Sequence, residues 1–279
     1  MNSMPEIHQF NHAAMATHFQ VRIPDQEKTY AAQAAQASFD LLDRLESRLS
    51  RFRANSDIAQ LANLAAGEKL RVSEPAFACL QIAKRMETAT QSAFCATPAA
   101  MQTQPSLPQW ELVDAEHSIL CLSGRLDFDL GAIGKGFALD RMAELIRDWD
   151  CSSFLLVAGG SSILAGDPPP GASGWSCGLG EDDAPHRLLI TNASLSGSGL
   201  AVKGSHIFDP RTGLSAPRQA RAWVLADTAA ESDALSTACM VLSEPELAAL
   251  IAQDNSWLAF LDSADGPQPI GNRPVPLQP

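Results

Sequence analysis

The stretch Leu126-Asp-Phe-Asp129-Leu-Gly131-Ala-Ile-Gly134-Lys135-Gly136-Phe-Ala-Leu-Asp140 carries the strongest structural signal in this chain. It begins with apolar residues that alternate with aspartates, a pattern typical of the end of a strand. Three glycines and a lysine follow, and apolar residues then recur at helical spacing from Ala138 to Trp149. The stretch therefore predicts a strand, a glycine turn and a helix.

A glycine turn at the start of a helix is suited to binding phosphate. Its backbone N–H groups point toward the ligand, and Lys135 would add a full positive charge. The spacing excludes two known phosphate loops. A Walker loop needs Ser or Thr after its lysine, where this chain has Gly136, and the glycine intervals do not match the dinucleotide-binding fingerprint. A tight connection with a surface lysine is the simpler alternative, and the residues leave it open.

Length and composition indicate a globular protein with a sizeable core. The chain has 279 residues, 46% of them hydrophobic, and a mean hydropathy of −0.05. Apolar runs stay well short of the roughly 20 residues that span a bilayer. The first residues, Met1–Glu6, lack the basic start and apolar segment of a signal peptide. We therefore expect a soluble, cytoplasmic protein without a membrane span.

Charge and cysteine content narrow the function classes further. A formal net charge of −12 argues against a nucleic-acid partner, because phosphate backbones are bound by basic surfaces. The six cysteines are dispersed without a Cys-x-x-Cys pair, which argues against a zinc site and is typical of a reducing compartment. An acidic protein that binds a phosphorylated ligand needs local positive charge from helix N-termini, a lysine or a divalent cation.

Helices and strands are expected to alternate irregularly, with no break in composition between them. This favours an α+β fold, with mixed β-sheets packed against α-helices in a single domain over residues 1–279 and a Pro-rich tail from about residue 266. Ser92–Trp110 is expected to be irregular. Strands are expected at 14–23, 118–122, 125–130, 153–164 with an interruption at 159–162, 187–195, 222–226 and 257–261, and helices at about 28–52, 56–61, 74–90, 231–242 and from 243.

Asp233 and Thr237 stand four residues apart in a predicted helix, so their oxygens share one face. A carboxylate and a hydroxyl are hard oxygen ligands of the kind that hold Mg²⁺ when a substrate phosphate completes its coordination. The alternative is purely structural, because an Asp near a helix start is favourable in its own right and Thr often bonds its own backbone.

Two further segments contain residues that could take part in chemistry. His206 precedes an Asp-Pro turn, and histidine is the usual general base near neutral pH, although a lone loop histidine is more often structural or exposed. Gly159, Gly160 and Ser161 interrupt an apolar strand and could let a ligand approach the backbone closely. A β-bulge would explain the same glycines.

Each of these motifs has a simple explanation, but their order along the chain is specific. Over nearly its whole length the sequence resembles the FAD:protein FMN transferases, the ApbE-type flavin transferases. The segments that carry the resemblance are Met15–Thr17, Phe52–Ile58, Asp129–Asp140, Gly159-Gly160, Ser196-Gly197, His206–Gly213 and Asp233–Thr237.

The resemblance implies an ApbE-like α+β domain that binds FAD with Mg²⁺. Such enzymes cleave the FAD pyrophosphate, attach FMN to a threonine of an acceptor flavoprotein and release AMP. By the same resemblance, Ala132 would offer the metal a main-chain carbonyl, Asp233 and Thr237 side-chain oxygens, and His206 a base. The positions that match FAD-binding residues are Met15, Phe52, Arg53, Cys95, Lys135, Gly159, Gly160, Ser161, His206 and Ile207.

The sequence departs from the family at a few positions. Cys95 stands where the family carries an aspartate that contacts FAD, and Ser161 follows the glycine pair where aspartate is usual. These changes spare the metal and phosphate positions and alter the nucleoside side. Two alternatives to FMN transfer therefore stay open: an FAD pyrophosphatase that releases FMN and AMP, and a protein that binds or delivers FAD without catalysis.

Overall fold

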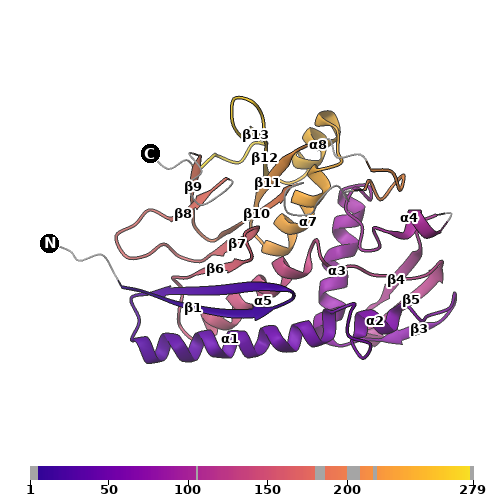
Figure 1. Cartoon of the computed structure of the whole chain (residues 1–279), viewed down its shortest axis with the longest axis horizontal. Coiled ribbons are helices and arrows are strands. Elements are labelled where there is room, and N and C mark those ends of the chain that lie inside the picture. The colour runs from indigo at the N-terminus through magenta and orange to yellow at the C-terminus, as the bar shows by residue number, and fades with distance from the viewer. Residues whose placement is uncertain (1–5, 105, 180–185, 200–207, 216–218, 277–279) are drawn as a thin grey trace.

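The computed structural model describes residues 6–104, 106–179, 186–199, 208–215 and 219–276. Its centre is an eight-stranded sheet in the order β1-β2-β6-β7-β10-β11-β12-β13 (Figure 1). Every neighbouring pair in this sheet is antiparallel. The strands are β1 (Ile7–Ala14), β2 (Thr17–Pro24), β6 (Leu155–Ala158), β7 (Ser162–Ala165), β10 (Ala193–Gly199), β11 (Arg221–Ala226), β12 (Leu258–Leu261) and β13 (Gln268–Ile270).

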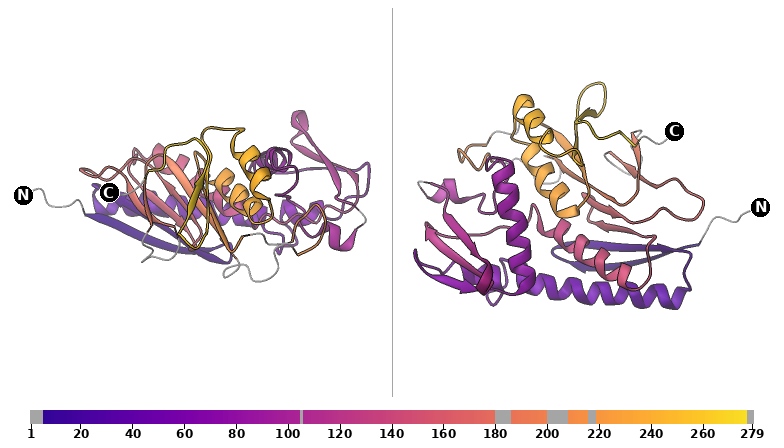
Figure 2. Two further views of the ribbon diagram at one scale, coloured as in Figure 1. Left: turned by 90° about the horizontal axis from the view of Figure 1, so that it is seen from above. Right: turned by 180° about the vertical axis from the view of Figure 1, so that it is seen from behind.

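Helices cover one face of this sheet. The long helix α1 (Lys28–Leu49), α5 (Gly134–Asp148) and α7 (Ala229–Cys239) pack on it, and α3 (Glu74–Ala89) and α8 (Glu244–Ile251) extend this layer (Figures 1 and 2). Within the described residues, none of the helices is both long enough and apolar enough to cross a membrane.

The other face of the sheet carries a smaller core. Along β11, Ala222 and Val224 belong to the core under the helices, whereas Trp223 and Leu225 belong to the second core. This alternation is the period of two that a strand imposes on its side chains. The hairpin β8 (Trp175–Gly178) and β9 (Arg187–Ile190) contributes Trp175, Cys177, Leu188 and Ile190 to this second core.

A three-stranded sheet in the order β3-β5-β4 lies at the far end of α1 (Figure 1). Its strands are β3 (Lys69–Arg71), β4 (Gln109–Val113) and β5 (Ser118–Ser123), accompanied by α2 (Asp57–Leu61), α4 (Ala100–Thr103) and the 3₁₀ turn η1 (Asp114–Glu116). Ile119 of this sheet and Leu80 of α3 belong to the same core cluster as the residues under α5 and α7. The predicted α+β combination of β-sheets packed with α-helices is confirmed, but the strand pairs of the described sheets are antiparallel rather than mixed in direction.

The predicted strand at 125–130 is wrong. Leu126, Phe128 and Leu130 are buried as the alternation suggested, but their backbone joins no sheet. Phe128 N–H donates to Leu126 O, and Asp129 N–H donates to Ala96 O in a different loop. The alternating burial therefore belongs to an irregular segment before α5 that bonds to the loop containing Ala96 and has no strand partner.

Other boundaries differ where local signals were weak. The predicted first strand at 14–23 is the second arm of a hairpin, in which Ala14 pairs with Thr17 across Met15 and Ala16. The predicted strand at 153–164 is two strands, β6 and β7, joined by a turn at Gly159–Ser161. The segment predicted to be irregular contains α4 and the start of β4, and the Pro-rich tail contains β13.

Gly136 lets α5 and α7 approach each other more closely than any side chain would allow. A Cβ atom at this position would lie 2.0 Å from the carbonyl oxygen of Ala229 and 2.4 Å from its carbonyl carbon. Both are backbone atoms, which cannot rotate away as a side chain could. The helix pair therefore depends on glycine at position 136.

We predict that Gly136→Ala lowers the free energy of unfolding by about 1–3 kcal/mol, because the added methyl group forces the two helices apart. Chemical denaturation measures the change. Gly134→Ala is the matched control in the same helix turn, since its Cβ would meet nothing closer than 3.6 Å, and its stability should stay within about 1 kcal/mol of wild type. Equal losses in the two variants would contradict the close approach.

Candidate phosphate and metal site

Two helix N-termini meet beneath the sheet and bring Asp233 to the glycine turn. The first turn of α5 donates the Gly136 N–H to Asp233 Oδ2 at 3.0 Å, and Lys135 Nζ lies 3.6 Å from the same oxygen. Asp233 is only 4% exposed, so its carboxylate relies on these protein partners in place of water. The structure thus brings together the helix-borne acid and the lysine-bearing turn that the sequence singled out.

Asp140 makes the reciprocal contact from α5 to α7. Its Oδ1 accepts the N–H of Ala229 at 2.7 Å, and its Oδ2 accepts the N–H of Ala230 at 2.9 Å. These are the first two N–H groups of α7, which have no partner within the helix. An aspartate of α7 therefore accepts an N–H group from the first turn of α5, and an aspartate of α5 accepts two N–H groups from the first turn of α7.

Burial raises the pKa of Asp140 from 3.8 to about 7, although the two N–H groups of α7 act in the opposite direction. The carboxylates of Glu144 and Glu231 add smaller contributions that raise it further. The sequence analysis gave Asp140 no role of its own, although it ends the Asp129–Asp140 segment, because there it has the appearance of an ordinary polar residue on an amphipathic helix.

A buried row of hydroxyl groups fixes α7 to β10. Ser194 Oγ and Ser196 Oγ each lie 2.8 Å from Ser232 Oγ, and Ser198 Oγ lies 3.0 Å from Ser236 Oγ. Alternate strand residues face the helix, while the helix residues recur one turn apart. The serines hold the helix that carries Asp233 at a defined height over the sheet.

The turn between β6 and β7 reaches the same acid. Ser162 Oγ donates to Asp233 Oδ1 at 2.8 Å, so the two carboxylate oxygens have different partners. Gly159 adopts φ +57°, and a Cβ there would lie 2.7 Å from Thr17 Oγ1. Gly160 has open space at its Cβ position, and Ser161 Oγ lies 3.4 Å from Ser162 Oγ.

Thr237 and Ala132 are the other two oxygen donors that the sequence predicted for the metal. Thr237 Oγ1 lies 3.3 Å from both the Asp233 carbonyl oxygen and Ser198 Oγ. Ala132 lies in the turn that precedes α5. In the described part of the chain, no group of three or more His, Cys, Asp or Glu side chains could hold a metal. One carboxylate with neutral oxygens is the donor set of a Mg²⁺ site that a phosphate ligand completes.

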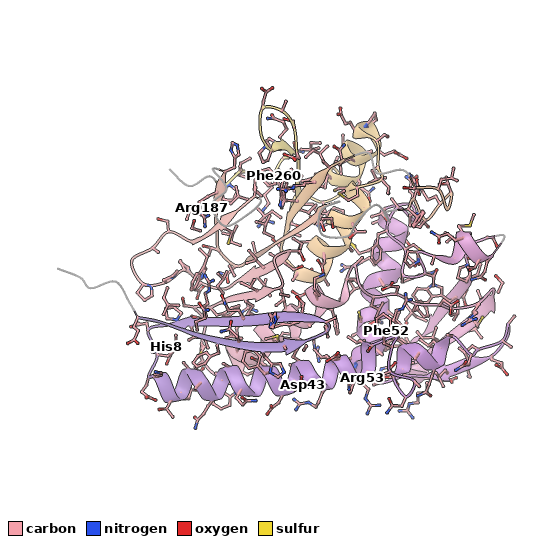
Figure 3. All side chains as sticks on the ribbon, viewed as in Figure 1. His8, Asp43, Phe52, Arg53, Arg187 and Phe260 are labelled. Carbon is pink, nitrogen blue, oxygen red and sulfur yellow. The ribbon has the colours of Figure 1, made fainter. Side chains whose placement is uncertain are left out.

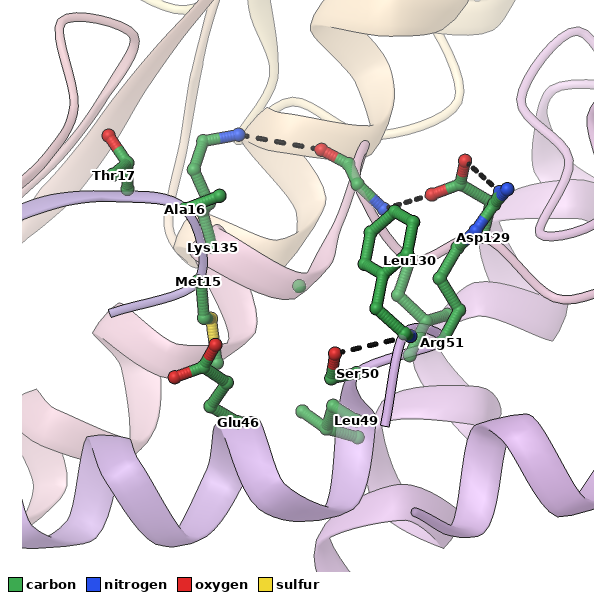
Figure 4. Close-up of a pocket in the computed structure, with 13 residues that line it drawn as sticks. Met15, Ala16, Thr17, Glu46, Leu49, Ser50, Arg51, Asp129, Leu130 and Lys135 are labelled. Carbon is green, nitrogen blue, oxygen red and sulfur yellow. Dashed lines mark hydrogen bonds and ion pairs between the residues drawn. The ribbon is translucent and has the colours of Figure 1, made fainter. Parts of the chain in front are cut away.

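A cavity of about 320 Å³ opens beside Lys135. Figure 4 shows the chain of contacts along its wall: Lys135 Nζ donates to Gly131 O at 3.5 Å, Gly131 N–H to Asp129 Oδ1 at 2.9 Å, and Arg51 to Asp129 Oδ2 at 2.7 Å. Met15 and Phe52 also line this cavity. A second cavity of about 460 Å³ shares Arg51 and Asp129 with the first, so the ion pair separates the two.

The aromatic and basic residues at the cavity mouth come from the loop after α1. Phe52 is 86% exposed, with the Arg51 guanidinium 5.2 Å from the centre of its ring. Arg53 follows Phe52 on the same loop (Figure 3). It does not line the cavity itself, but its guanidinium lies 3.5 Å from Glu46, which does. An exposed ring beside a cavity is available to stack on a ligand.

Cys95 lies apart from this cavity. It is 6% exposed, its Sγ lies 3.4 Å from Thr97 Oγ1, and it is not among the residues that line either cavity. Burial and the neighbouring Glu87 raise the pKa of its thiol to about 11. An aspartate here would place a second negative charge beside Glu87, whose own pKa burial already raises.

His206 and Ile207 lie outside the described residues. The rest of their motif forms a turn in which Thr212 and Gly213 N–H both donate to the Asp209 carbonyl oxygen. Arg211 binds the Asp209 carboxylate and reaches Glu246 at 2.8 Å. These bonds hold the described part of the motif against the start of α8.

We predict that Ser232→Ala lowers the free energy of unfolding by about 1–3 kcal/mol, since it leaves the buried hydroxyls of Ser194 and Ser196 without this partner. Denaturant titration is the measurement. Ser47→Ala serves as the control, because Ser47 is half-buried and its hydroxyl donates to Arg44 O in its own helix, away from the hydroxyl row. If both variants unfold at the same denaturant concentration, the hydroxyl row does not stabilise α7.

The pKa of Asp140 predicts a pH dependence of stability. With a folded pKa of about 7 and an ordinary value of 3.8, the stability contributed by protonated Asp140 is fully present below pH 3.8 and is lost as pH rises through 7. Asp140→Asn removes this titration. The advantage of wild type over the variant should therefore shrink between pH 4 and pH 8 in thermal melts. If the advantage of wild type grows with pH instead, the N–H groups of α7 lower the pKa of Asp140 by more than burial raises it.

The chain is similar to known proteins of one family. The pattern that defines the ApbE family matches residues 15–261. An FAD:protein FMN transferase of Klebsiella pneumoniae (strain 342) is 26% identical over 223 residues, which are 67% of this chain and 68% of the relative. One of Treponema pallidum (strain Nichols) is 28% identical over 162 residues, 50% of this chain and 45% of the relative.

Solved structures agree on the fold. The apo form of Pseudomonas stutzeri flavinyl transferase ApbE superposes with a TM-score of 0.80 at 19% identity, covering 96% of this chain and 95% of that one. The family pattern spans the glycine turn, the serine strand and the helix that carries Asp233. The chain therefore belongs to the ApbE family.

Proposed function

We propose that this protein is an FAD:protein FMN transferase. It would cleave the FAD pyrophosphate and attach FMN through a phosphoester to a threonine of an acceptor flavoprotein, with AMP as the second product. The observation that carries the proposal is the meeting of Asp233 with Lys135 and the Gly136 N–H beside a cavity. The similar proteins from Klebsiella and Treponema are named FAD:protein FMN transferases, which supports the proposal.

The residues of the turn suit a bound pyrophosphate. Gly134 and Lys135 at the start of α5 line the cavity, and their backbone N–H groups and the Lys135 ammonium would stabilise the negative charge that develops on the leaving AMP. Met15 and Phe52 would contact the nucleoside part of FAD. The threonine hydroxyl would attack the FMN phosphorus, the bond to the AMP oxygen would break, and a base would accept the hydroxyl proton. We assign that base to His206.

The oxygen donors around Asp233 fit Mg²⁺. Asp233 and Thr237 would hold the ion with the Ala132 carbonyl, and the bound ion would neutralise the pyrophosphate charge. Lys135 neutralises Asp233 in the structure. With Mg²⁺ bound at Asp233, the metal would neutralise that acid, and the Lys135 ammonium would be available to bind a phosphate. We further propose a cytoplasmic location, supported by six cysteines that are all buried and unpaired.

Incubation with FAD and Mg²⁺, with and without an acceptor protein, tests the proposal. Covalent flavin fluorescence on the acceptor supports FMN transfer. Release of free FMN and AMP without labelling would replace the transferase with a pyrophosphatase. Binding of FAD without either product would leave a binding or delivery protein. A parallel reaction with EDTA should abolish turnover and would otherwise remove the metal from the proposal.

Two variants should separate the metal from the phosphate contacts. Asp233→Asn retains a hydrogen-bond acceptor for Gly136 but loses the anionic ligand, so we predict a loss of turnover of at least ~100-fold that added Mg²⁺ partly restores. Lys135→Met keeps the acid and should instead raise the KM for FAD and lower kcat, without restoration by added Mg²⁺. Steady-state kinetics with Mg²⁺ and FAD varied independently distinguish them. Asp43→Asn, an exposed acid paired with His12, is the control, and identical behaviour of the two site variants would contradict the assignment.

A further inference from the structure

Asp140 and Asp233 connect α5 and α7 at two points. Asp233 of α7 accepts the N–H of Gly136, and Asp140, one turn further along α5, accepts the N–H groups of Ala229 and Ala230. Ala229 lies one turn before Asp233. In each helix the two contact positions are four residues apart, on one face. Position 136 of α5 meets position 233 of α7, and position 140 of α5 meets position 229 of α7.

This arrangement fixes the position of Asp233 along α5 as well as its distance from it. The serine row holds α7 against β10, and the close approach at Gly136 sets its distance from α5. The contact at Asp140 adds a second bonded point between α5 and α7, at the first turn of α7. A shift of α7 by even part of a turn would break the bonds to Ala229 and Ala230 and would carry Asp233 away from Lys135.

We propose that Asp140 is a positioning residue of the phosphate and metal site. Its carboxylate holds the first turn of α7 against α5 and thereby keeps Asp233 opposite the Lys135-bearing turn. The inference rests on the proposed function, because it assigns Asp140 a part in binding the metal and FAD, although Asp140 touches neither. Residues that orient metal ligands from outside the site typically contribute 10–100-fold to metal affinity.

Thr228 provides a matched control for simple helix capping. Its side chain accepts the Glu231 N–H at 3.4 Å, so it also satisfies the N-terminus of α7, but from within the same segment of chain. Thr228→Ala weakens the same helix end without removing any bond between α5 and α7. If Asp140 only stabilised α7, variants at Asp140 and Thr228 that lose the same stability would also lose the same affinity for Mn²⁺.

The experiment compares Asp140→Ala, Asp140→Asn and Thr228→Ala at pH 8, above the pKa of Asp140. Mn²⁺ binding is measured by electron paramagnetic resonance without FAD, and FAD binding by flavin fluorescence with Mg²⁺. Thermal melts record the stability of each variant. We expect Asp140→Ala to weaken Mn²⁺ binding 10–100-fold and Thr228→Ala to weaken it less than twofold. Asp140→Asn keeps one of two acceptors and should fall between them, and it decides the question if Asp140→Ala does not fold.

A ligand-free measurement separates this inference from the proposed function. Amide hydrogen exchange at Gly136, resolved by NMR, reports whether its N–H still meets Asp233. It should accelerate at least tenfold in the Asp140 variants and stay near the wild-type rate in Thr228→Ala. Equal effects of Asp140 and Thr228 on exchange and Mn²⁺ affinity would overturn the positioning role. If wild type binds neither Mn²⁺ nor FAD, the proposed function fails, and Gly136 exchange still decides whether Asp140 positions α7.

Discussion

The hydrogen bond from the Gly136 N–H to Asp233 is the contact on which the site depends. It requires α5 and α7 to approach until backbone meets backbone, which only a glycine at position 136 permits. That approach in turn places Lys135 within 3.6 Å of the acid. Packing between helices and the chemistry of the site are therefore set by the same pair of residues.

Asp233 is a buried carboxylate that is fully partnered before any ligand binds. Its oxygens accept bonds from the Gly136 N–H and the Ser162 hydroxyl, with the Lys135 ammonium nearby. A buried charge without such partners would cost several kcal/mol. In a protein of net charge −12, this gathering of N–H groups and one lysine supplies the local positive potential that a phosphate needs.

The parts of the fold that the sequence predicted are those with local signals. Glycine spacing marked the start of α5, helical periodicity marked α1, and the helix-start sequence Ser73-Glu-Pro75 marked α3. Met15 and Ala16 gave no sign of the hairpin between β1 and β2, because both adopt positive φ without the Asn or Gly that such turns prefer. The segment 125–130 misled because its burial alternates while its hydrogen-bond partners lie in loops.

The candidate site was predictable only in part, for a related reason. Asp233, Thr237 and Lys135 stand in short motifs whose chemistry can be recognised within a few residues. Asp140 and Ser232 act through contacts with residues 36 to 90 positions away, and no local pattern distinguishes them from ordinary helix residues. Their roles follow from how the helices cross, which depends on the packing of the whole sheet.

Coupling between stability and function follows from this construction. Asp233 closes the first turn of α5, anchors Ser162 of β7 and offers an oxygen to the candidate metal. A substitution that removes its carboxylate therefore weakens the helix pair and the site together, and loss of activity alone would not show which was lost first. An amide keeps the shape and one acceptor while removing the charge, so the difference between alanine and asparagine at position 233 separates the structural contribution from the electrostatic one. The same logic applies at Asp140, where the two acceptor oxygens serve two N–H groups of one helix end.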